Sequence, residues 1–459
     1  MAGEVRADDV PGFSLEAVAP PAITNEDRKR ARDRRVVRTL HARGGFQPRL
    51  LWLLIGPGIL AMLGENDAPS MLSYATTGAQ FGVGFFLPFI VVTFLVAFIV
   101  QEQTVRLGAA THRGHAELIF ERFGRFWGWF AMDDLMLGNF LTLVTEFIGI
   151  RAGLGFFGVP PAFAVLGGLA LVVLAVSTAR YWTWERLVLG LAIFNGLFIP
   201  VALLAHPQWP DIGRAFVTWG PLPGGLQNKT LLILVSNIGA TVTPWMLFFQ
   251  QSAVVDKGLT KTDVRQGRID TALGACLAAL FACAVVVAAA PLFTNGVDAS
   301  SFQGAEFAQA LEPFIGHVGA TLFALGIFEA GLVAAITIST SSASAFGEVT
   351  GWARSLNRTV REGGPFYGVL LASAVLAAAL VLIPGAPLLY IVLIVNVIAV
   401  LAMPPALLFL YLLVNDQEIM GSLRNTRGLN IVAGAAVVIL TGAGLLFGVS
   451  VLFPQLFGG

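Results

Sequence analysis

The sequence predicts an all-α polytopic membrane protein, built as an inverted repeat of five plus five spanning helices with an eleventh helix added. Composition is the first observation: 56% of the 459 residues are hydrophobic, 12% are charged, and the mean hydropathy is +0.77. A soluble enzyme carries about twice that share of charged residues, so the composition excludes this class. The other observations are eleven apolar segments of spanning length and matched interruptions in the first and sixth of them.

The chain starts with a polar segment, residues 1–46, and a basic run covers residues 28–49. The first residues contain no apolar core, so they lack the pattern of a cleaved signal peptide. We expect a largely disordered cytosolic tail whose basic residues contact anionic lipid and help to fix the topology. Residues 47–459 are then the transmembrane domain.

Each apolar segment is close to the roughly 20 residues that a spanning helix requires. Their cores are residues 50–74, 85–105, 127–150, 160–176, 187–204, 231–255, 272–293, 318–346, 367–383, 388–414 and 431–453. With the N-terminus inside, all of the 28 lysines and arginines except Arg151, Arg214 and Lys229 fall on the cytoplasmic side. This positive-inside pattern predicts a cytoplasmic N-terminus and an external C-terminus in a bacterial inner membrane.

The first apolar segment is interrupted by residues that a lipid-facing helix would exclude. Residues 54–82 read LIGPGILAMLGENDAPSMLSYATTGAQFG, with Glu65, Asn66 and Asp67 shortly before Pro69. Pro69 removes a backbone donor, so we expect the helix to break here and to leave carbonyls and carboxylates at mid-membrane depth. A cation suits these groups. The alternative is a proline-kinked helix whose acids lie in a loop at the membrane surface.

The sixth segment has a similar interruption. Residues 237–251 read NIGATVTPWMLFFQQ, in which small residues precede Pro244. The two interruptions lie five segments apart, so the first and sixth helices cross the membrane in opposite directions, as an inverted repeat requires. In such folds both breaks meet at the bilayer midplane, where unwound carbonyls and helix ends coordinate a small ion or substrate.

Several motifs occur in order along the chain. They are Asp67-Ala68-Pro69-Ser70, Gly78-Ala79-Gln80-Phe81-Gly82, Arg106-Leu107-Gly108, Glu146-Phe147-Ile148-Gly149, Gly239-Ala240-Thr241-Val242-Thr243-Pro244-Trp245 and Ala330-Gly331-Leu332. This set resembles the natural resistance-associated macrophage protein (NRAMP) family of divalent metal transporters, over essentially all of residues 50–453. The family's patterns are Asp-Pro-Gly-Asn in the first helix and Gly-Ala-Thr-Val-Met-Pro-His in the sixth. The resemblance implies a leucine-transporter-like fold.

The resemblance also implies a metal site made only of oxygen donors. Its members are Asp67, Ser70, Thr243, Asn396 and the backbone carbonyls near Gly64 and Ala240. Ser70 takes the place of the family's Asn, Thr243 that of its Met, and Asn396 that of a Gln. Glu65 and Asn66 stand outside the family motif. They either add a second carboxylate and an amide beside Asp67, which favours a divalent ion, or point elsewhere.

The loss of the thioether ligand removes a soft donor that favours manganese, iron or cadmium over magnesium. A pocket widened by these replacements fits a partly hydrated Mg²⁺ ion. The pattern therefore resembles the magnesium-transporting branch related to the family, and predicts alternating-access transport of Mg²⁺ first and Mn²⁺ second. The alternatives are a proton-coupled Mn²⁺/Fe²⁺ symporter of the same family, an amino-acid carrier of the same fold, and a metal-sensing membrane protein without useful flux.

Proton coupling is the family property that this sequence supports least. The family's proton route falls here on Met136, Leu143, Glu146, Trp245 and Gln250, and only Glu146 among these titrates. The sequence therefore predicts transport without a coupled proton, with Trp245 and Gln250 kept as gating candidates. Glu329, in the eighth segment, is either a replacement acid or a structural hydrogen-bonding group between helices.

No catalytic triad or nucleotide motif is present, so the sequence predicts a protein that is not an enzyme and needs no cofactor. The divalent ion is the cargo and the lipid bilayer is the surrounding partner. The balanced net charge gives no indication of nucleic acid, and no obligate protein partner is inferred. Cys276 and Cys283 have neither a zinc nor a disulfide spacing and are expected to be packing residues.

Overall fold

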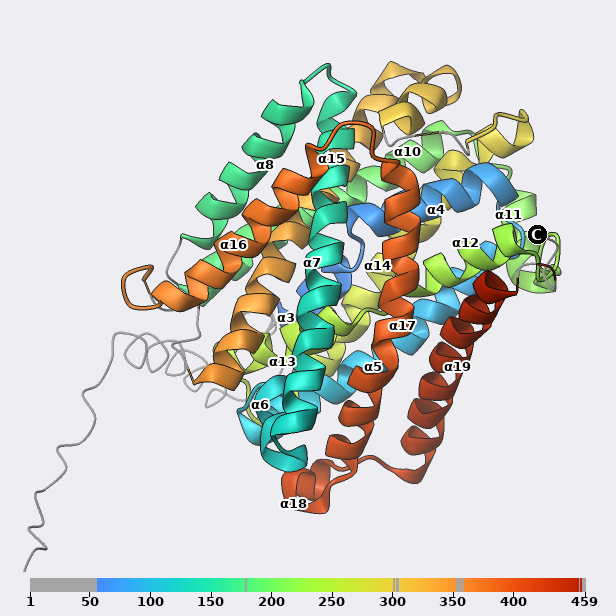
Figure 1. The fold of residues 1–459 in the computed structure, drawn as a ribbon. Helices are drawn as coiled ribbons and strands as arrows, with labels where there is room; N and C mark the ends of the chain where they lie inside the picture. The colour runs from blue at the N-terminus through green and yellow to red at the C-terminus, as the bar shows by residue number, and fades with distance from the viewer. Residues whose placement is uncertain are drawn as a thin grey trace, which may run out of the picture.

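The structure is a computed structural model that describes residues 56–177, 180–299, 302, 305–351, 356, 359–453 and 455. The predicted tail, residues 1–46, and the start of the first segment, residues 50–55, lie outside the described residues. Within the described part every regular element is a helix (Figure 1).

Helices of spanning length account for the predicted segments. Nine stretches in the described ranges are long and apolar enough to cross a membrane: α5 (Phe86–Thr111), α7 (Arg125–Gly155), α9 with η1 and α10 (Tyr181–Leu204), α12 with α13 (Asn228–Lys257), η2 with α14 (Lys261–Thr294), α15 (Ala305–Thr350), α16 (Gly364–Val381), α17 (Leu388–Asn415) and α19 (Arg427–Leu452). The shorter α8 (Pro161–Val176) and the divided first segment, α3 (Pro57–Gly64) with α4 (Ala68–Phe81), complete the predicted set.

Several helices are longer than their apolar cores. α14 begins at Val264, well before the core predicted at residue 272. A polar end turn outside the hydrocarbon region continues this helix and carries no hydropathy signal, which explains the difference. α15 begins at Ala305, but Gly316 has non-helical backbone angles (φ 71°, ψ 168°), so residues 305–315 form a separate helix ahead of the core predicted at residue 318. Three short connecting helices were also not predicted, α6 (His115–Phe123), α11 (Trp209–Thr218) and α18 (Gln417–Met420).

Both predicted interruptions are present. α3 ends at Gly64 and α4 begins at Ala68, while α12 (Asn228–Gly239) ends before Ala240 and α13 (Pro244–Lys257) begins at Pro244. Pro69 and Pro244 each stand in the first turn of the second half-helix. A proline there removes no intrahelical hydrogen bond, so each one starts a new helix and does not kink a continuous one.

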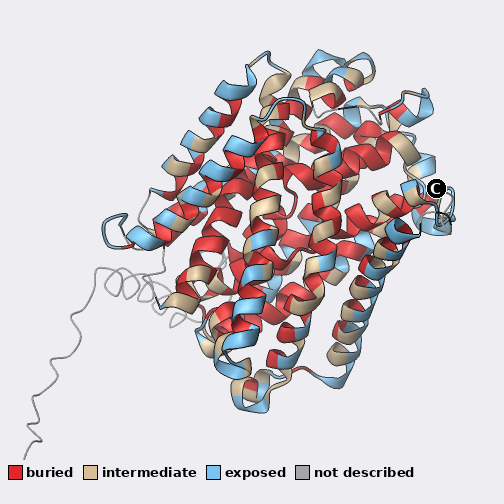
Figure 2. Cartoon of the chain, in the orientation of Figure 1, coloured by how far each residue is buried: buried red, intermediate tan, exposed pale blue. Residues whose placement is uncertain are grey.

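The alternative of a kinked helix with its acids at the surface is wrong. Glu65 is 0% exposed and Asp67 is 1% exposed, so both carboxylates lie inside the protein. In Figure 2 the buried segments gather at the centre of the molecule, where these breaks lie, and the exposed ones lie on outlying helices such as α8 and α19.

The degree of burial separates central helices from peripheral ones. The apolar window of α12 with α13 is 89% buried, whereas that of α19 is only 28% buried. Large apolar side chains cover the outer faces, such as Phe163 on α8 at 72% exposure and Ile431 on α19 at 73%. Such faces suit contact with lipid tails, so the centre of the bundle is the part shielded from the bilayer.

Small residues allow the central helices to approach one another closely. A Cβ atom on Gly239 of α12 would lie 1.9 Å from the Asn396 carbonyl oxygen of α17. A Cβ atom on Gly78 of α4 would lie 2.2 Å from the Val286 carbonyl oxygen of α14. In both cases the obstacle is helix backbone, which cannot rotate aside as a side chain can, so these contacts fix the distance between interrupted and continuous helices.

We therefore expect Gly239→Ala to destabilise the protein by about 1–3 kcal/mol, the usual range for overpacking. The measurement is the midpoint of thermal unfolding in detergent. Gly190→Ala is the matched control, because Gly190 lies in a helix and a methyl group added there would have nothing within 4 Å. Equal midpoints for the two variants would show that α12 and α17 do not approach each other as closely as described.

Candidate metal-binding site

The two interrupted helices are joined by a hydrogen bond between Glu65 and Thr243. Thr243 Oγ1 donates to Glu65 Oε2 over 2.9 Å, although 178 positions separate these residues in the sequence. Both side chains are buried, at 0% and 3% exposure. Glu65 Oε1 has no hydrogen-bond partner in the described part of the chain. The junction therefore holds a carboxylate and a hydroxyl, with one carboxylate oxygen not used by the protein.

Asp67 lies beside this junction, at the start of α4. Its Oδ1 accepts a hydrogen bond from the Ser70 N–H at 2.9 Å, and the Ser70 hydroxyl also contacts the carboxylate. Glu146 of α7 faces the same helix end, where its Oε2 accepts from the Ala68 N–H at 3.1 Å. The Asp67 and Glu146 side chains are also in contact. The partial positive charge of a helix N-terminus stabilises acids in this position.

Backbone carbonyls of both breaks have side-chain partners. The Tyr74 hydroxyl donates to Ala240 O at 2.9 Å, and Asn396 Nδ2 donates to Pro69 O at 3.3 Å. Asn396 Nδ2 also lies 3.5 Å from Ser236 Oγ in α12, so Asn396 links the two interrupted helices. A carbonyl oxygen has two lone pairs, so Ala240 O keeps the capacity to accept one further interaction, whereas Pro69 O lies inside α4 and also accepts from the helix backbone.

Asn66 is engaged away from the junction. Its Nδ2 donates to Ala278 O in α14 at 2.9 Å, and its Oδ1 has no partner in the described residues. The sequence left two outcomes open for Asn66: an amide beside Asp67, or a side chain that points elsewhere. The structure places its amide nitrogen against the neighbouring helix α14. Asn66 therefore anchors the first break to α14.

Gly64 and Trp245 form one wall of the junction. A Cβ atom on Gly64 would lie 2.9 Å from Trp245 Cη2, so the indole covers the end of α3. Trp245 Nε1 is buried and has no hydrogen-bond partner among the described residues. A cavity of about 10 Å³ beside Thr243 and Trp245 reaches α7 and α17. This volume holds about one water molecule, so the junction is closed on this side.

The other candidates for proton transfer or gating are bonded to different helices. Gln250 Nε2 donates to Thr271 Oγ1 of α14 at 2.8 Å, and Thr104 Oγ1 of α5 lies 3.3 Å from Gln250 Oε1. Glu329 Oε1 accepts from Asn195 Nδ2 at 3.3 Å. Gln250 and Glu329 are therefore hydrogen-bonded to neighbouring helices away from the junction, while Glu146 and Trp245 lie at the breaks.

The donors at the junction are oxygens. In the described ranges no group of three or more His, Cys, Asp and Glu side chains is arranged to hold a metal ion. An ion held here would depend on the acids Glu65 and Asp67, on hydroxyl and carbonyl oxygens, and on water. This donor set suits hard cations such as Mg²⁺ and Mn²⁺, which prefer oxygen ligands.

The sequence predicts that Lys257 and Asp270 form inner-gate or interfacial pairs, but it did not identify Glu185 as the partner of Lys257 in a buried ion pair near the start of α3. Lys257 Nζ of α13 lies 2.9 Å from Glu185 Oε2 of α9 (Tyr181–Ala192), with side chains 0% and 3% exposed. Asp270 of α14 accepts from the Gly56 N–H at 3.0 Å and the Gly58 N–H at 2.6 Å, so it caps α3. The only sequence signal for Glu185 is its place directly after Trp182 and Trp184, at the edge of the fifth apolar segment.

A buried histidine was also missed. His115, at the start of α6 and outside the spanning segments, is 0% exposed and its Nδ1 lies 2.9 Å from Gln251 Oε1. Burial lowers the pKa of His115 to about 4, and the hydrogen bond with Gln251 opposes this shift only in part. His115 is therefore neutral at neutral pH and connects α6 to α13.

Comparison with known proteins gives relatives over most of the chain. A divalent metal cation transporter MntH of Ralstonia nicotianae is 29% identical over 297 residues, covering 60% of this chain and 64% of the relative. The chain thus spans slightly less than two thirds of that protein. The transporter of the same name from Yersinia enterocolitica is 26% identical over 409 residues, covering 86% of this chain and 94% of the relative. These relatives are named as transporters, in agreement with the prediction of a protein that is not an enzyme.

The fold is shared with a crystal structure of a manganese transporter from Eremococcus coleocola, with a TM-score of 0.73, 22% identity and 88% of each chain covered. This similarity confirms the predicted fold class. The sequence profile described as natural resistance-associated macrophage protein-like matches residues 58–450. The chain therefore belongs to the natural resistance-associated macrophage protein family of divalent metal transporters.

Proposed function

We propose that this protein carries divalent metal ions across a bacterial inner membrane by alternating access, with Mg²⁺ preferred and Mn²⁺ second. The observation that supports this proposal best is the Glu65–Thr243 hydrogen bond, which joins the two helix breaks through oxygen donors only. Two buried acids at one break, Glu65 and Asp67, provide the negative charge that favours a divalent cation over a monovalent one.

The proposed ligands are the Asp67 carboxylate, the Ser70 and Thr243 hydroxyls, and the carbonyl oxygens near Gly64 and Ala240. Asn396 and Glu65 complete the set, and Asn66 holds the break in place through α14. Thr243 stands where the family has a thioether, so the strongest soft donor is absent from this position. Mg²⁺ keeps several of its waters when bound, and hydroxyls can hydrogen-bond to these waters.

Trp245 is the proposed gate on one side of the junction. Its indole covers Gly64 and contacts Phe249 with ring centroids 5.7 Å apart, which extends an aromatic wall along α13. An ion can leave past this wall only when α3 or α13 moves. Closure by a large side chain at a broken helix is the arrangement that alternating access requires.

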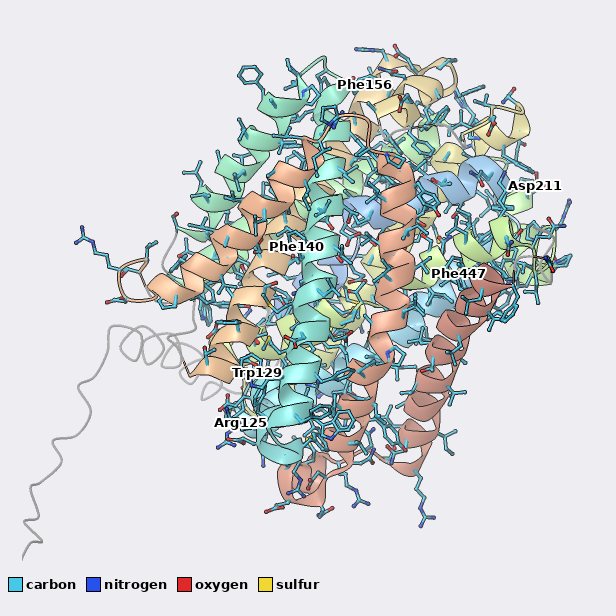
Figure 3. The ribbon with its side chains drawn as sticks, viewed as in Figure 1. Arg125, Trp129, Phe140, Phe156, Asp211 and Phe447 are labelled. Carbon is cyan, nitrogen blue, oxygen red and sulfur yellow. The ribbon has the colours of Figure 1, made fainter. Side chains whose placement is uncertain are left out.

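We also propose that the N-terminal tail lies in the cytoplasm and the C-terminus outside. In Figure 3, Arg125 and Phe156 mark opposite ends of α7. The Arg125 end adjoins α6, which carries Arg122, and the Phe156 end follows Arg151, one of the few basic residues assigned to the outer side. The excess of positive charge at the Arg125 end supports its cytoplasmic location.

A proton-coupled symporter of the same family is the second candidate. One observation favours it: Glu146 is fully buried beside Asp67, and its Oε1 has no hydrogen-bond partner in the described part. Against it, Leu143 and Trp245 cannot bind and release protons, and Gln250 is hydrogen-bonded to α14. A continuous chain of titratable groups is therefore missing, and we propose transport without a coupled proton.

Asp67→Ala should reduce Mg²⁺ uptake into proteoliposomes to the level of protein-free vesicles, because it removes a full charge from the junction. Asp211→Ala is the matched control, since Asp211 lies on the exposed α11 with its side chain 56% exposed. Both variants should remain folded, with Asp67→Ala unfolding at a lower temperature because it loses the cap of α4. Normal uptake by Asp67→Ala would remove Asp67 from the site.

Thr243→Met should raise Mn²⁺ and Cd²⁺ uptake relative to Mg²⁺ by at least about tenfold, a change equivalent to about 1.4 kcal/mol. The substitution supplies a soft donor and removes the hydrogen bond to Glu65. Competition between metals in a flux assay gives the ranking. Thr93→Met is the control, because Thr93 Oγ1 bonds within its own helix α5. An unchanged ranking in Thr243→Met would mean that Thr243 does not face the ion.

Metal uptake should be driven by the metal gradient and by a negative interior potential, without acidification of the lumen. The reason is the missing chain of proton-binding groups in α7 and α13. A pH-sensitive dye trapped in the vesicles reports lumen pH during Mg²⁺ or Mn²⁺ influx, and an added proton ionophore calibrates the response. Acidification in proportion to the metal taken up would contradict transport without a coupled proton and support the symporter.

A further inference from the structure

Glu329 is a buried acid that lies outside the junction of the two breaks. Glu329 of α15 is 5% exposed and Asn195 is 0% exposed. Asn195 lies in η1 (Ile193–Leu197), a 3-10 turn that separates α9 from α10 (Phe198–Leu204) in the fifth segment. Asn195 Nδ2 donates to Glu329 Oε1 at 3.3 Å. The pair therefore links α15 to the point where the fifth segment departs from α-helical geometry.

Two oxygen atoms of this pair are left without partners. Glu329 Oε2 and Asn195 Oδ1 are both buried and make no hydrogen bond in the described part of the chain. Each is an acceptor when Glu329 is ionised, so neither can satisfy the other. An ionised carboxylate with one long hydrogen bond, inside a membrane protein, is one of the most costly arrangements known for a side chain.

Neighbouring charges do not relieve this cost. Among the described residues Glu329 forms no ion pair, and its hydrogen bond comes from the uncharged Asn195. η1, α8 and α10 contain no titratable residue. Several buried titratable residues on other helices that contact α15 have partners elsewhere: Asp67 with Ser70, Tyr74 with Ala240, Glu146 with Ala68, His115 with Gln251, Glu185 with Lys257 and Asp270 with Gly58.

We propose that Glu329 and Asn195 form a proton-binding site. The proton resides on Glu329 Oε2 and is donated to Asn195 Oδ1, while Asn195 Nδ2 donates to Glu329 Oε1. A carboxylic acid and a primary amide are complementary in this way, since each offers one donor and one acceptor to the other. One bound proton thus satisfies both unpartnered oxygens and removes the buried charge. This inference does not depend on which metal is transported.

A metal cation is a poorer occupant than a proton. Hard cations take six or more oxygen ligands, and the pair offers only the two oxygens that the protein leaves unused. The surrounding packing is also tight, since a Cβ atom on Gly326 of α15 would lie 2.7 Å from Phe198 Cζ. A proton needs no added volume, so the geometry favours it.

Infrared spectroscopy of the full-length protein in detergent, exchanged into D₂O at neutral pH, tests this proposal. A protonated carboxyl group absorbs at a higher C=O stretching frequency than a carboxylate. Glu329→Gln should lose one acid band relative to the unmodified protein, with no loss of carboxylate absorption. Gln keeps one donor and one acceptor toward Asn195, so this variant preserves the hydrogen-bonded pair.

Glu348→Gln is the matched control on the same helix. Glu348 accepts from Ser252 Oγ at 2.7 Å and from the Ala116 N–H at 3.2 Å, as an ionised carboxylate does. This variant should lose carboxylate absorption and keep the acid band assigned to Glu329. Loss of carboxylate absorption in Glu329→Gln would overturn the proposal.

Asn195→Ala provides a test that does not depend on removing the acid. It should keep the acid band and shift it to higher frequency, because the carboxyl O–H loses its acceptor. An unshifted band would show that the proton is not donated to Asn195. This measurement decides the question even where Glu329→Gln does not fold, since Glu329 itself is unchanged.

Discussion

The structure depends on the requirement that backbone groups exposed by a helix break inside a membrane find hydrogen-bond partners within the protein. Each break is satisfied by side chains from other helices. Glu146 of α7 accepts from the Ala68 N–H at the first break, and Tyr74 of α4 donates to Ala240 O at the second. Asn396 of α17 adds a hydrogen bond to the Pro69 carbonyl in the first turn of α4. The buried polar residues at the centre of the bundle therefore allow the two unwound segments to exist inside the membrane, because they supply hydrogen-bond partners for the backbone.

This requirement also explains why carboxylates stand at the starts of both half-helices of the first segment. Asp270 accepts from the N–H groups of Gly56 and Gly58 at the start of α3, and Asp67 caps α4 directly after the break. In each case a carboxylate faces the positive end of a helix dipole. α3 is thus a short rigid helix that is held by α14 at one end and by the junction at the other. A short rigid helix of this kind can move as a unit.

The fold was largely predictable from the sequence, whereas the partners within the site were not. Hydropathy located the spanning segments, and Pro69 and Pro244 located both breaks, because these are local signals. The Glu65–Thr243 contact joins residues 178 positions apart, and no periodicity reports such a pairing. The ion pair of Glu185 with Lys257 was missed for the same reason. η1 was missed because a 3-10 turn inside an apolar segment leaves the hydropathy unchanged.

Fold and cargo are therefore determined by different parts of the chain. The fold shared with the Eremococcus coleocola manganese transporter persists at 22% identity because many apolar positions accept any side chain of suitable size. Metal preference depends on a few donor atoms, and in the proposed site Thr243 would offer a hydroxyl where the family pattern has a thioether. In this protein the hydroxyl is also hydrogen-bonded to Glu65, a second acid that the family pattern lacks. A common fold hosts different functions, so the fold alone does not give the metal selectivity. The metal selectivity has to be derived from the residues of the junction.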